Sequence, residues 1–301
     1  MKGTTPSFRS TPEPPFPFIG NYRREVEVAV EAAVAAGQVV LRIYDGQTFG
    51  EYSKVDGSPV TDADLAADRV IRSILQEAFP SDALLTEEGQ DDGRRLHASR
   101  CWIVDPIDGT EQFIRRTGEF DVLVALVKDS RPVVAAGYQP TTSTLVVAEK
   151  GRGAWVSRGG DTFTPLAFDN PSFPVRICSS KWFGAPENAQ VIAAIAARVD
   201  SAEVFEASEI GFTPRMFLEP RAIDGMIGIR TGVEQDLASE WDFAVADLAI
   251  NEAGGVVTDL AGMPFQYNKQ RPVNVGGLVA SVSPDVHGKL LAAIRAVKPD
   301  L

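Results

Sequence analysis

The stretch from Trp102 to Phe113, W-I-V-D-P-I-D-G-T-E-Q-F, combines carboxylates, a proline, a glycine and a threonine in twelve positions. Its apolar start reads as a buried strand, and Asp105 and Asp108 follow where that strand is expected to end in a turn. Mg²⁺ prefers octahedral oxygen coordination and is usually held by a few carboxylates together with a substrate phosphate. The sequence therefore predicts a site for a hard cation at this turn.

The residues around the two aspartates supply the rest of a phosphate site. Pro106 restrains the turn, and the turn frees the carbonyl of Ile107 as a further oxygen ligand. Gly109 permits a tight approach of the backbone, and with Thr110 it reads as the start of a short helix whose free N–H groups accept a phosphate. Two metal ions about 3.5 to 4 Å apart hydrolyse phosphate esters without a protein nucleophile. Thr110 Oγ and Asp64 are expected to orient the attacking water.

Other acidic residues also fall at the ends of predicted elements, namely Asp64, the pair Glu87-Glu88, and Asp242. Each has a purely structural alternative. Asp64 follows Thr61 by three positions and would complete a capping box, and Asp242 precedes a helical run and would serve as its N-cap. The glutamate pair alone would be a solvated turn, and Asp-Pro-x-Asp-Gly alone an Asx turn. Their combination with a phosphate-ready helix start favours the metal site.

Composition excludes several classes of protein. An apolar fraction of 44% and a charged fraction of 23% are those of an ordinary globular protein, and no apolar run approaches the about 18 residues of a membrane span. The net charge of -12 argues against binding a nucleic-acid polymer. Cys101 and Cys178 are read as buried free thiols, and His97 and His287 as surface residues, so neither zinc nor a histidine-based triad is indicated.

The elements expected around the site alternate along the chain. Residues 1–21 form a Pro-rich tail without the features of a signal peptide, which predicts disorder and a cytoplasmic protein. Amphipathic helices are predicted over 22–45 and from Thr61 to Pro80. Strands are predicted at 83–86, 102–104, 121–127, 133–138, 144–148, 176–179, 203–205, 223–229, 256–258 and 278–281, and further helices at 187–197, 243–253 and 284–297.

A Pro-rich break at residues 170–174 predicts a domain boundary. The first part, 22–170, would be an N-terminal α+β metal-binding domain containing an antiparallel meander. The second part, 175–301, would be a C-terminal α/β domain that completes the active site.

Five segments together resemble the inositol monophosphatase superfamily of Mg²⁺-dependent, lithium-sensitive phosphatases. They are T-D-A-D (61–64), T-E-E-G (86–89), W-I-V-D-P-I-D-G-T (102–110), E-W-D-F-A-V-A-D (240–247) and E-A-G-G (252–255). The resemblance implies an α+β / α/β sugar-phosphatase fold with α-β-α-β-α layers, two or three Mg²⁺ ions and inhibition by Li⁺. It implies metal ligands at Glu87, Asp105, the Ile107 carbonyl, Asp108 and Asp242. Thr110 and Asp64 would activate water, and Glu88 would act behind the ligands or through water.

The segments G-T-E-Q-F-I-R-R-T-G-E-F (109–120) and K-V-D-G-S-P-V-T (54–61) resemble the 3'(2'),5'-bisphosphate nucleotidase branch of that superfamily. This branch converts 3'-phosphoadenosine 5'-phosphate into AMP and phosphate. Gly109 and Thr110 would then seat the scissile phosphate, while Lys54, Arg115 and Arg116 would neutralise a second one. The chain departs from the branch at 208–215, where Arg215 takes the place of a lysine that follows a serine pair and would bind the substrate instead.

Three hypotheses follow. The first is a Mg²⁺-dependent phosphomonoesterase that acts on a bisphosphate nucleotide. The second keeps the chemistry but takes inositol 1-phosphate or histidinol phosphate as substrate, and the third is a non-catalytic nucleotide- or metal-binding sensor. The expected partner is a small phosphorylated metabolite, and the protein is expected to be a monomer or homodimer.

Overall fold

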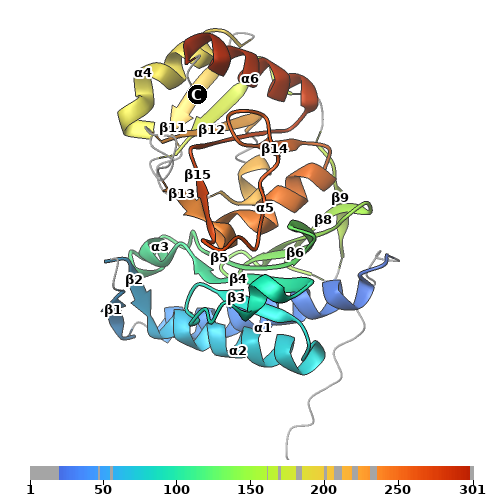
Figure 1. The fold of residues 1–301 in the computed structure, drawn as a ribbon. Coiled ribbons are helices and arrows are strands. Elements are labelled where there is room, and N and C mark those ends of the chain that lie inside the picture. The colour runs from blue at the N-terminus through green and yellow to red at the C-terminus, as the bar shows by residue number, and fades with distance from the viewer. Residues whose placement is uncertain are drawn as a thin grey trace, which may run out of the picture.

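The computed structural model describes residues 20–46, 48–54, 57–160, 162–168, 171–180, 185–199, 202–206, 212–218, 223–230 and 236–298. Five layers are stacked in the order helices, sheet, helix, sheet, helices (Figure 1). The predicted α-β-α-β-α arrangement is confirmed. The tail prediction for residues 1–21 lies outside the described residues except at its last two positions.

The first two layers are a pair of helices and a seven-stranded sheet. The helices are α1 (Arg23–Gly46) and α2 (Asp62–Ala78). The sheet has the order β3-β4-β5-β6-β7-β8-β9, formed by β3 (Ala83–Thr86), β4 (Arg100–Asp108), β5 (Asp121–Lys128), β6 (Arg131–Gln139), β7 (Thr144–Glu149), β8 (Gly153–Arg158) and β9 (Thr164–Leu166). Only β3 and β4 are parallel neighbours in it; the other pairs are antiparallel.

Strand β4 shows why both faces of this sheet are covered. Its side chains alternate between the two faces, as a strand requires. Trp102 and Val104 lie in the core shared with α1 and α2, whereas Cys101 and Ile103 lie in the core on the opposite face. Because both faces of β4 are covered by other layers, its sequence is a continuous apolar run and does not alternate between apolar and polar residues.

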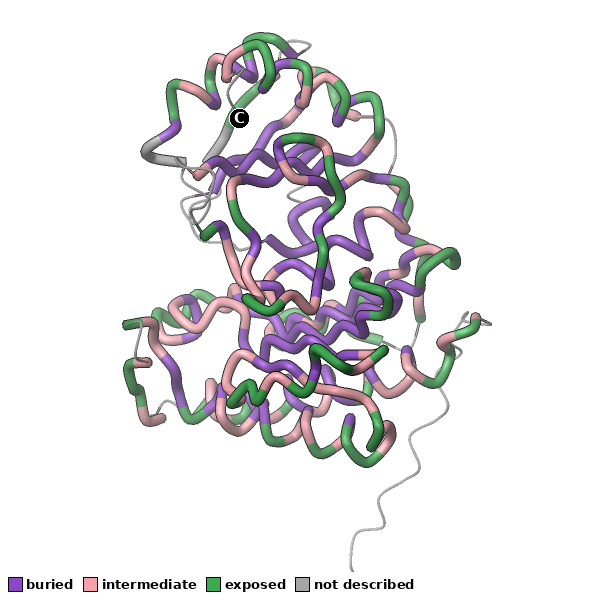
Figure 2. The backbone as a smooth tube through the Cα atoms, viewed as in Figure 1, coloured by how far each residue is buried: buried purple, intermediate pink, exposed green. Residues whose placement is uncertain are grey.

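The third layer is α5 (Glu240–Glu252), which is buried on nearly every side between the two sheets (Figure 2). Its residues Phe243, Val245 and Leu248 share one core with β4 and β5 and with the second sheet. A helix that is apolar all round belongs in such a position. The predicted boundary at 170–174 separates the two sheets in sequence, but α5 packs against the sheet of the first part.

The fourth and fifth layers close the molecule. The second sheet has the order β11-β10-β12-β16-β14, formed by β11 (Glu203–Glu206), β10 (Arg176–Ser179), β12 (Gly225–Ile229), β16 (Gly277–Ser281) and β14 (Val256–Thr258). Its outer face packs on α4 (Ala185–Ala196) and α6 (Pro284–Val297). Within the part of the chain described, no helix combines the length and apolarity needed to cross a membrane.

Several short elements were not predicted. They are the pair β1 (Glu51–Ser53) and β2 (Pro59–Thr61), the pair β13 (Asp236–Ser239) and β15 (Val273–Val275), strands β8 and β9, and the 3₁₀ turns η1 (Arg94–His97) and η3 (Pro214–Phe217). The surface assignment of His287 is wrong. Its side chain is buried on α6 because Thr258 and Ser281 hydrogen-bond both ring nitrogens, at 2.9 and 3.2 Å.

Candidate active site

The parallel pairing of β3 with β4 brings two acidic segments together. Thr86 lies opposite Val104, so Glu87, the first residue after β3, lies beside Asp105 of β4. The Glu87 N–H donates to the Val104 carbonyl at 3.2 Å and continues the ladder by one step. Since carboxyl ends of parallel strands meet at one edge of a sheet, two segments far apart in sequence deliver acids to one place.

The two aspartates of the central motif are aligned by a β-bulge. The strand does not end at Val104 as expected but continues to Asp108, with Asp105 opposite Leu123 and Asp108 opposite Asp121. One extra residue is thereby accommodated on β4. Residues three apart on a regular strand point to opposite faces, and the inserted residue returns Asp108 to the side of Asp105. The Ile107 N–H donates to Asp105 Oδ1 at 3.0 Å, so the Asx contact is present as well.

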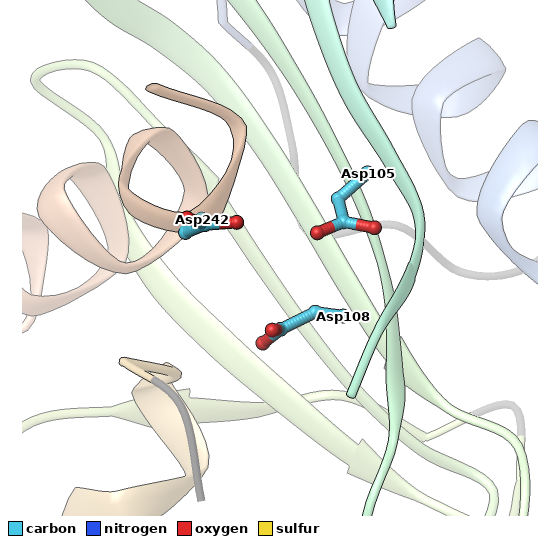
Figure 3. A group of neighbouring side chains, drawn as sticks. All are labelled: Asp105, Asp108 and Asp242. Carbon is cyan, nitrogen blue, oxygen red and sulfur yellow. The ribbon is translucent and has the colours of Figure 1, made fainter. Parts of the chain in front are cut away.

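The third aspartate comes from α5. This helix begins at Glu240, so Asp242 does not precede it but lies in its first turn, where it closes a capping box by accepting from the Ser239 N–H at 2.8 Å. Ligand oxygens of Asp105, Asp108 and Asp242 all lie within 4.8 Å of one another, and the side chains converge (Figure 3). Capping and convergence are compatible because each carboxylate has two oxygens.

Electrostatic repulsion is concentrated in this cluster. Burial raises the pKa of Asp105 and Asp108 well above the usual value, and the neighbouring carboxylates, including Glu87 and Asp242, raise it further. Burial likewise raises the pKa of Asp242 to about 7. Several buried carboxylates without a matching charge favour protonation or the binding of a cation.

Lys54 shows where a cation fits. Its Nζ lies 2.5 Å from Glu87 Oε1 and 2.6 Å from Glu88 Oε1. Burial lowers the pKa of Lys54, but attraction to Glu87 and Glu88 outweighs it and the pKa is raised. Burial also raises the pKa of Glu88 to about 7. A converging, all-oxygen ligand set that already attracts an ammonium group is suited to hard divalent cations.

Thr110 and Asp64 meet beside the aspartates. Thr110 begins the short helix α3 (Thr110–Ile114), and its Oγ1 is 3.0 Å from Asp64 Oδ1 and 3.2 Å from the Ile107 carbonyl oxygen, both acceptors. Asp64 uses its other oxygen for the predicted capping box, in which it accepts from the Thr61 N–H and Oγ1 at 2.8 and 2.6 Å. Burial raises the pKa of Asp64.

The arginine side chains that were predicted to lie near the substrate differ in their burial and in their partners. Arg215, on η3, is buried and donates to both oxygens of Asp121, Nε to Oδ1 at 2.7 Å and Nη2 to Oδ2 at 2.5 Å. This pair balances the charge of a carboxylate that faces Asp108 across the ladder. Arg115 and Arg116 are exposed, and the Arg116 guanidinium lies 4.3 Å from the centre of the Tyr44 ring.

A cleft of about 470 Å³ opens over the acidic cluster. Gly109 and Thr110 line it together with the three aspartates and Glu87, and the lining also includes Phe212, Leu237 and Arg230. Phe212 belongs to the segment 208–215, where the sequence departs from the nucleotidase branch and a change in the leaving-group pocket is predicted. Leu237 and Arg230 were not predicted. Arg230 directly follows β12. The sequence analysis used the ends of strands to find acidic site residues; the same signal, applied to basic residues, indicates this arginine.

Several known proteins are similar to this chain over much of its length. A 3'(2'),5'-bisphosphate nucleotidase CysQ of Aggregatibacter actinomycetemcomitans is 30% identical over 264 residues, which cover 85% of this chain and 92% of that protein. CysQ of Salmonella typhimurium is 39% identical over 137 residues, covering 45% of this chain, and the chain thus spans 55% of the length of that relative.

A crystal structure of CysQ from Bacteroides thetaiotaomicron, described as a bacterial member of the inositol monophosphatase family, superposes with a TM-score of 0.72. It is 27% identical and covers 87% of this chain and 98% of its own. Residues 21–202 of this chain match the model of the inositol monophosphatase family. Because that match takes in more than half of the chain, and one relative aligns over most of both lengths, the protein belongs to the inositol monophosphatase family.

Proposed function

We propose that this protein is a Mg²⁺-dependent phosphomonoesterase that removes phosphate from a small metabolite by activating water. The observation that carries the proposal is the convergence of Asp105, Asp108 and Asp242 within 4.8 Å beside the hydrogen bond from Thr110 to Asp64. The proposed metal ligands and Thr110, proposed to orient water with Asp64 behind it, line one cleft. A non-catalytic sensor of nucleotides or metals would not need a pair of residues that orients water.

Glu87, Asp105, the Ile107 carbonyl, Asp108 and Asp242 are the proposed ligands of two or three Mg²⁺ ions, with Glu88 behind them. When bound, these ions supply Lewis acidity toward phosphoryl oxygens and lower the pKa of water. Li⁺ is expected to inhibit by competing for one of the sites. On binding metal, Glu87 and Glu88 would release Lys54, whose ammonium group would then face the substrate.

The Thr110–Asp64 pair orients the attacking water. Thr110 Oγ1 donates its proton to Asp64, so its lone pairs are directed away from that carboxylate and can accept a hydrogen bond from water. In the reaction, the water oxygen bonds to phosphorus and the ester P–O bond breaks. One proton of the water stays on the released phosphate, and the other is transferred to the leaving oxygen. Gly109 and Thr110 would hold the phosphoryl oxygens with their N–H groups.

The substrate we favour is a 3',5'-bisphosphate nucleotide, 3'-phosphoadenosine 5'-phosphate, which would yield AMP and phosphate. The similarity to proteins named as bisphosphate nucleotidases supports this choice. The cleft supports it too, because Arg230 can pair with a second phosphate and Phe212 and Leu237 offer an apolar wall for a base. We assign the second phosphate to Arg230 and not to Arg215, because Arg230 lines the cleft, whereas Arg215 does not line it and pairs with Asp121. Cytoplasmic location and a monomeric or homodimeric state stay predictions.

The substrate is tested by turnover of 3'-phosphoadenosine 5'-phosphate, inositol 1-phosphate and histidinol phosphate under the same conditions. We expect the highest kcat/KM for the bisphosphate, and Arg230→Gln should reduce that value about 10-fold or more while leaving inositol 1-phosphate within about 2-fold. The exposed Arg94→Gln is the matched control. Faster turnover of inositol 1-phosphate by the unmodified enzyme would overturn the substrate assignment.

A further inference from the structure

The turn that carries Glu87 and Glu88 is supported from below by helix α2. Arg72 lies on this helix, and its Nη2 donates to Thr86 Oγ1 at 2.8 Å. Thr86 is buried and is the last residue of β3, directly before the glutamate pair. The guanidinium therefore contacts the residue from which the acidic turn departs.

The orientation of the Arg72 guanidinium is itself fixed. Asp68, one helical turn earlier on α2, is 8% exposed and accepts from Arg72 Nε at 2.8 Å. Two side chains on different elements thus hold two nitrogens of one planar group. Because an arginine fork has a rigid geometry, holding two of its nitrogens fixes its plane as well as its position.

Gly89 closes the same arrangement from the other end of the turn. Its N–H donates to the Thr86 carbonyl at 3.2 Å, so residues 86–89 form one closed turn. A Cβ at position 89 would lie 1.6 Å from Arg72 Nη2 and 2.5 Å from Thr86 Oγ1. The guanidinium occupies the space that a side chain at 89 would need, and only glycine lets the turn rest on it.

We propose that Arg72, held by Asp68, is a positioning residue that sets the placement of the Glu87-Glu88 turn and thereby the metal affinity of the site. The proposal rests on the function proposed above, in which Glu87 is a metal ligand. Residues that orient metal ligands from behind typically change metal affinity by about 10- to 100-fold when they are lost. Arg72 acts through Thr86 and Gly89 and does not itself reach the cleft lining.

The test measures binding of Mn²⁺, as a spectroscopic probe for Mg²⁺, by electron paramagnetic resonance without substrate. Arg72→Gln should weaken Mn²⁺ binding about 10-fold, with kcat at saturating Mg²⁺ within about 3-fold. The exposed Arg69→Gln removes the same charge from the same helix and should bind Mn²⁺ like the unmodified protein. Equal affinities of the two variants would overturn the proposal.

Further variants separate positioning from charge and test the contact between Arg72 and the turn at Gly89. Arg72→Lys keeps the charge but lacks the planar fork, so it should bind Mn²⁺ as weakly as Arg72→Gln; affinity equal to the unmodified protein would mean that only charge matters. Gly89→Ala should also weaken Mn²⁺ binding. The loss caused by Gly89→Ala should be smaller in an Arg72→Ala background, because the clash with the guanidinium is then gone. Additive losses in affinity would contradict the shared contact.

Failure of the enzymatic function has a different signature. If the unmodified protein binds Mn²⁺ with the predicted Arg72 dependence yet releases no phosphate from any ester, the proposed function is wrong and the positioning role stands. If phosphate is released but Arg72→Gln and Arg69→Gln bind Mn²⁺ equally, the positioning role is wrong and the function stands.

Discussion

Asp105 lies among other carboxylates, and their mutual repulsion opposes folding when no metal is bound. Asp105→Asn should lower turnover about 100-fold or more, because a charged ligand is lost, with little loss of stability. Asparagine keeps the oxygen that accepts from the Ile107 N–H. The measurement is thermal unfolding in the presence of a chelator together with phosphate release. A large fall in melting temperature of the metal-free variant would contradict the prediction.

The same residue makes a prediction about pH. The folded pKa of Asp105 is raised above its usual value of 3.8, so its ionisation costs stability as pH rises through that value and toward the folded pKa. In metal-free protein, the free energy of unfolding of Asp105→Asn minus that of the unmodified chain should therefore increase from pH 4 to pH 7. Urea titrations at several pH values measure it; a difference that shrinks over this range would show the opposite sign.

The side chain of Thr110 is expected to act through its hydroxyl group. Thr110→Ala should lower kcat about 100- to 1,000-fold, which lies within the range found when a side chain that assists proton transfer is lost. Thr110→Ser retains the hydroxyl and should stay within about 10-fold of the unmodified enzyme. Single-turnover phosphate release at saturating Mg²⁺ distinguishes them. A fully active alanine variant would remove Thr110 from the mechanism.

At this scale the sequence identifies the acids but not their partners. Asp105 and Asp108 are recognisable because they follow an apolar run, and Glu87 for the same reason. The pairing of Arg215 with Asp121, and the position of Lys54 between two glutamates, depend on elements far apart in the chain. No local pattern encodes which side chain will meet which across such distances.

At the scale of elements, the bulge in β4 and the start of α3 decide the geometry. Gly109 joins them with a φ of +100°, and a Cβ there would lie 2.9 Å from the Glu119 carbonyl oxygen. Gly109→Ala should therefore lower the free energy of unfolding by about 2 kcal/mol or more. Gly151 is the control, since its φ is +73° but nothing lies within 4 Å, and alanine there should cost about 1 kcal/mol.

Urea unfolding of both glycine variants makes that comparison, and equal losses would mean that the Glu119 contact is unimportant. Helical periodicity located α2 and α6 to within a residue or two at each end. It did not reveal the bulge, because Pro106 is compatible with either a turn or an interrupted strand. Strand β8 was missed because it lies among the glycines at 151–160, and β9 because it has only three residues.

At the scale of the whole molecule, α5 belongs to both parts of the chain. The order of elements indicated layers, but which sheet face α5 covers depends on the complete packing. The active site is accordingly shared: β3, β4 and α2 supply most of it and α5 supplies Asp242. The division at 170–174 remains a boundary in sequence, and whether either part folds alone is a separate prediction.

His287 lies on α6, on the outer face of the second sheet, and its burial leads to a prediction about stability. Burial lowers the pKa of His287 from 6.5 to about 4, so the unfolded chain binds a proton that the folded chain excludes between these values. Stability is then complete above pH 6.5 and falls as pH decreases toward 4. From pH 7.5 to pH 5 the unmodified protein should lose about 2 kcal/mol more than His287→Gln.

Guanidinium unfolding at the two pH values measures this difference, with the exposed His97→Gln as control. If His287→Gln and His97→Gln show the same pH dependence, the buried histidine does not contribute. The error in placing His287 has a physical reason. Lysine and aspartate flank it in sequence, but Thr258 and Ser281, which satisfy its nitrogens, come from two different strands.

The most direct measurement is phosphate release by the purified, folded protein from 3'-phosphoadenosine 5'-phosphate and a panel of other phosphomonoesters, with Mg²⁺ and with chelator. We predict release that requires Mg²⁺, is inhibited by Li⁺, and is lost in Asp105→Asn while that variant remains folded. No release from any ester in the presence of Mg²⁺ would contradict the proposed function.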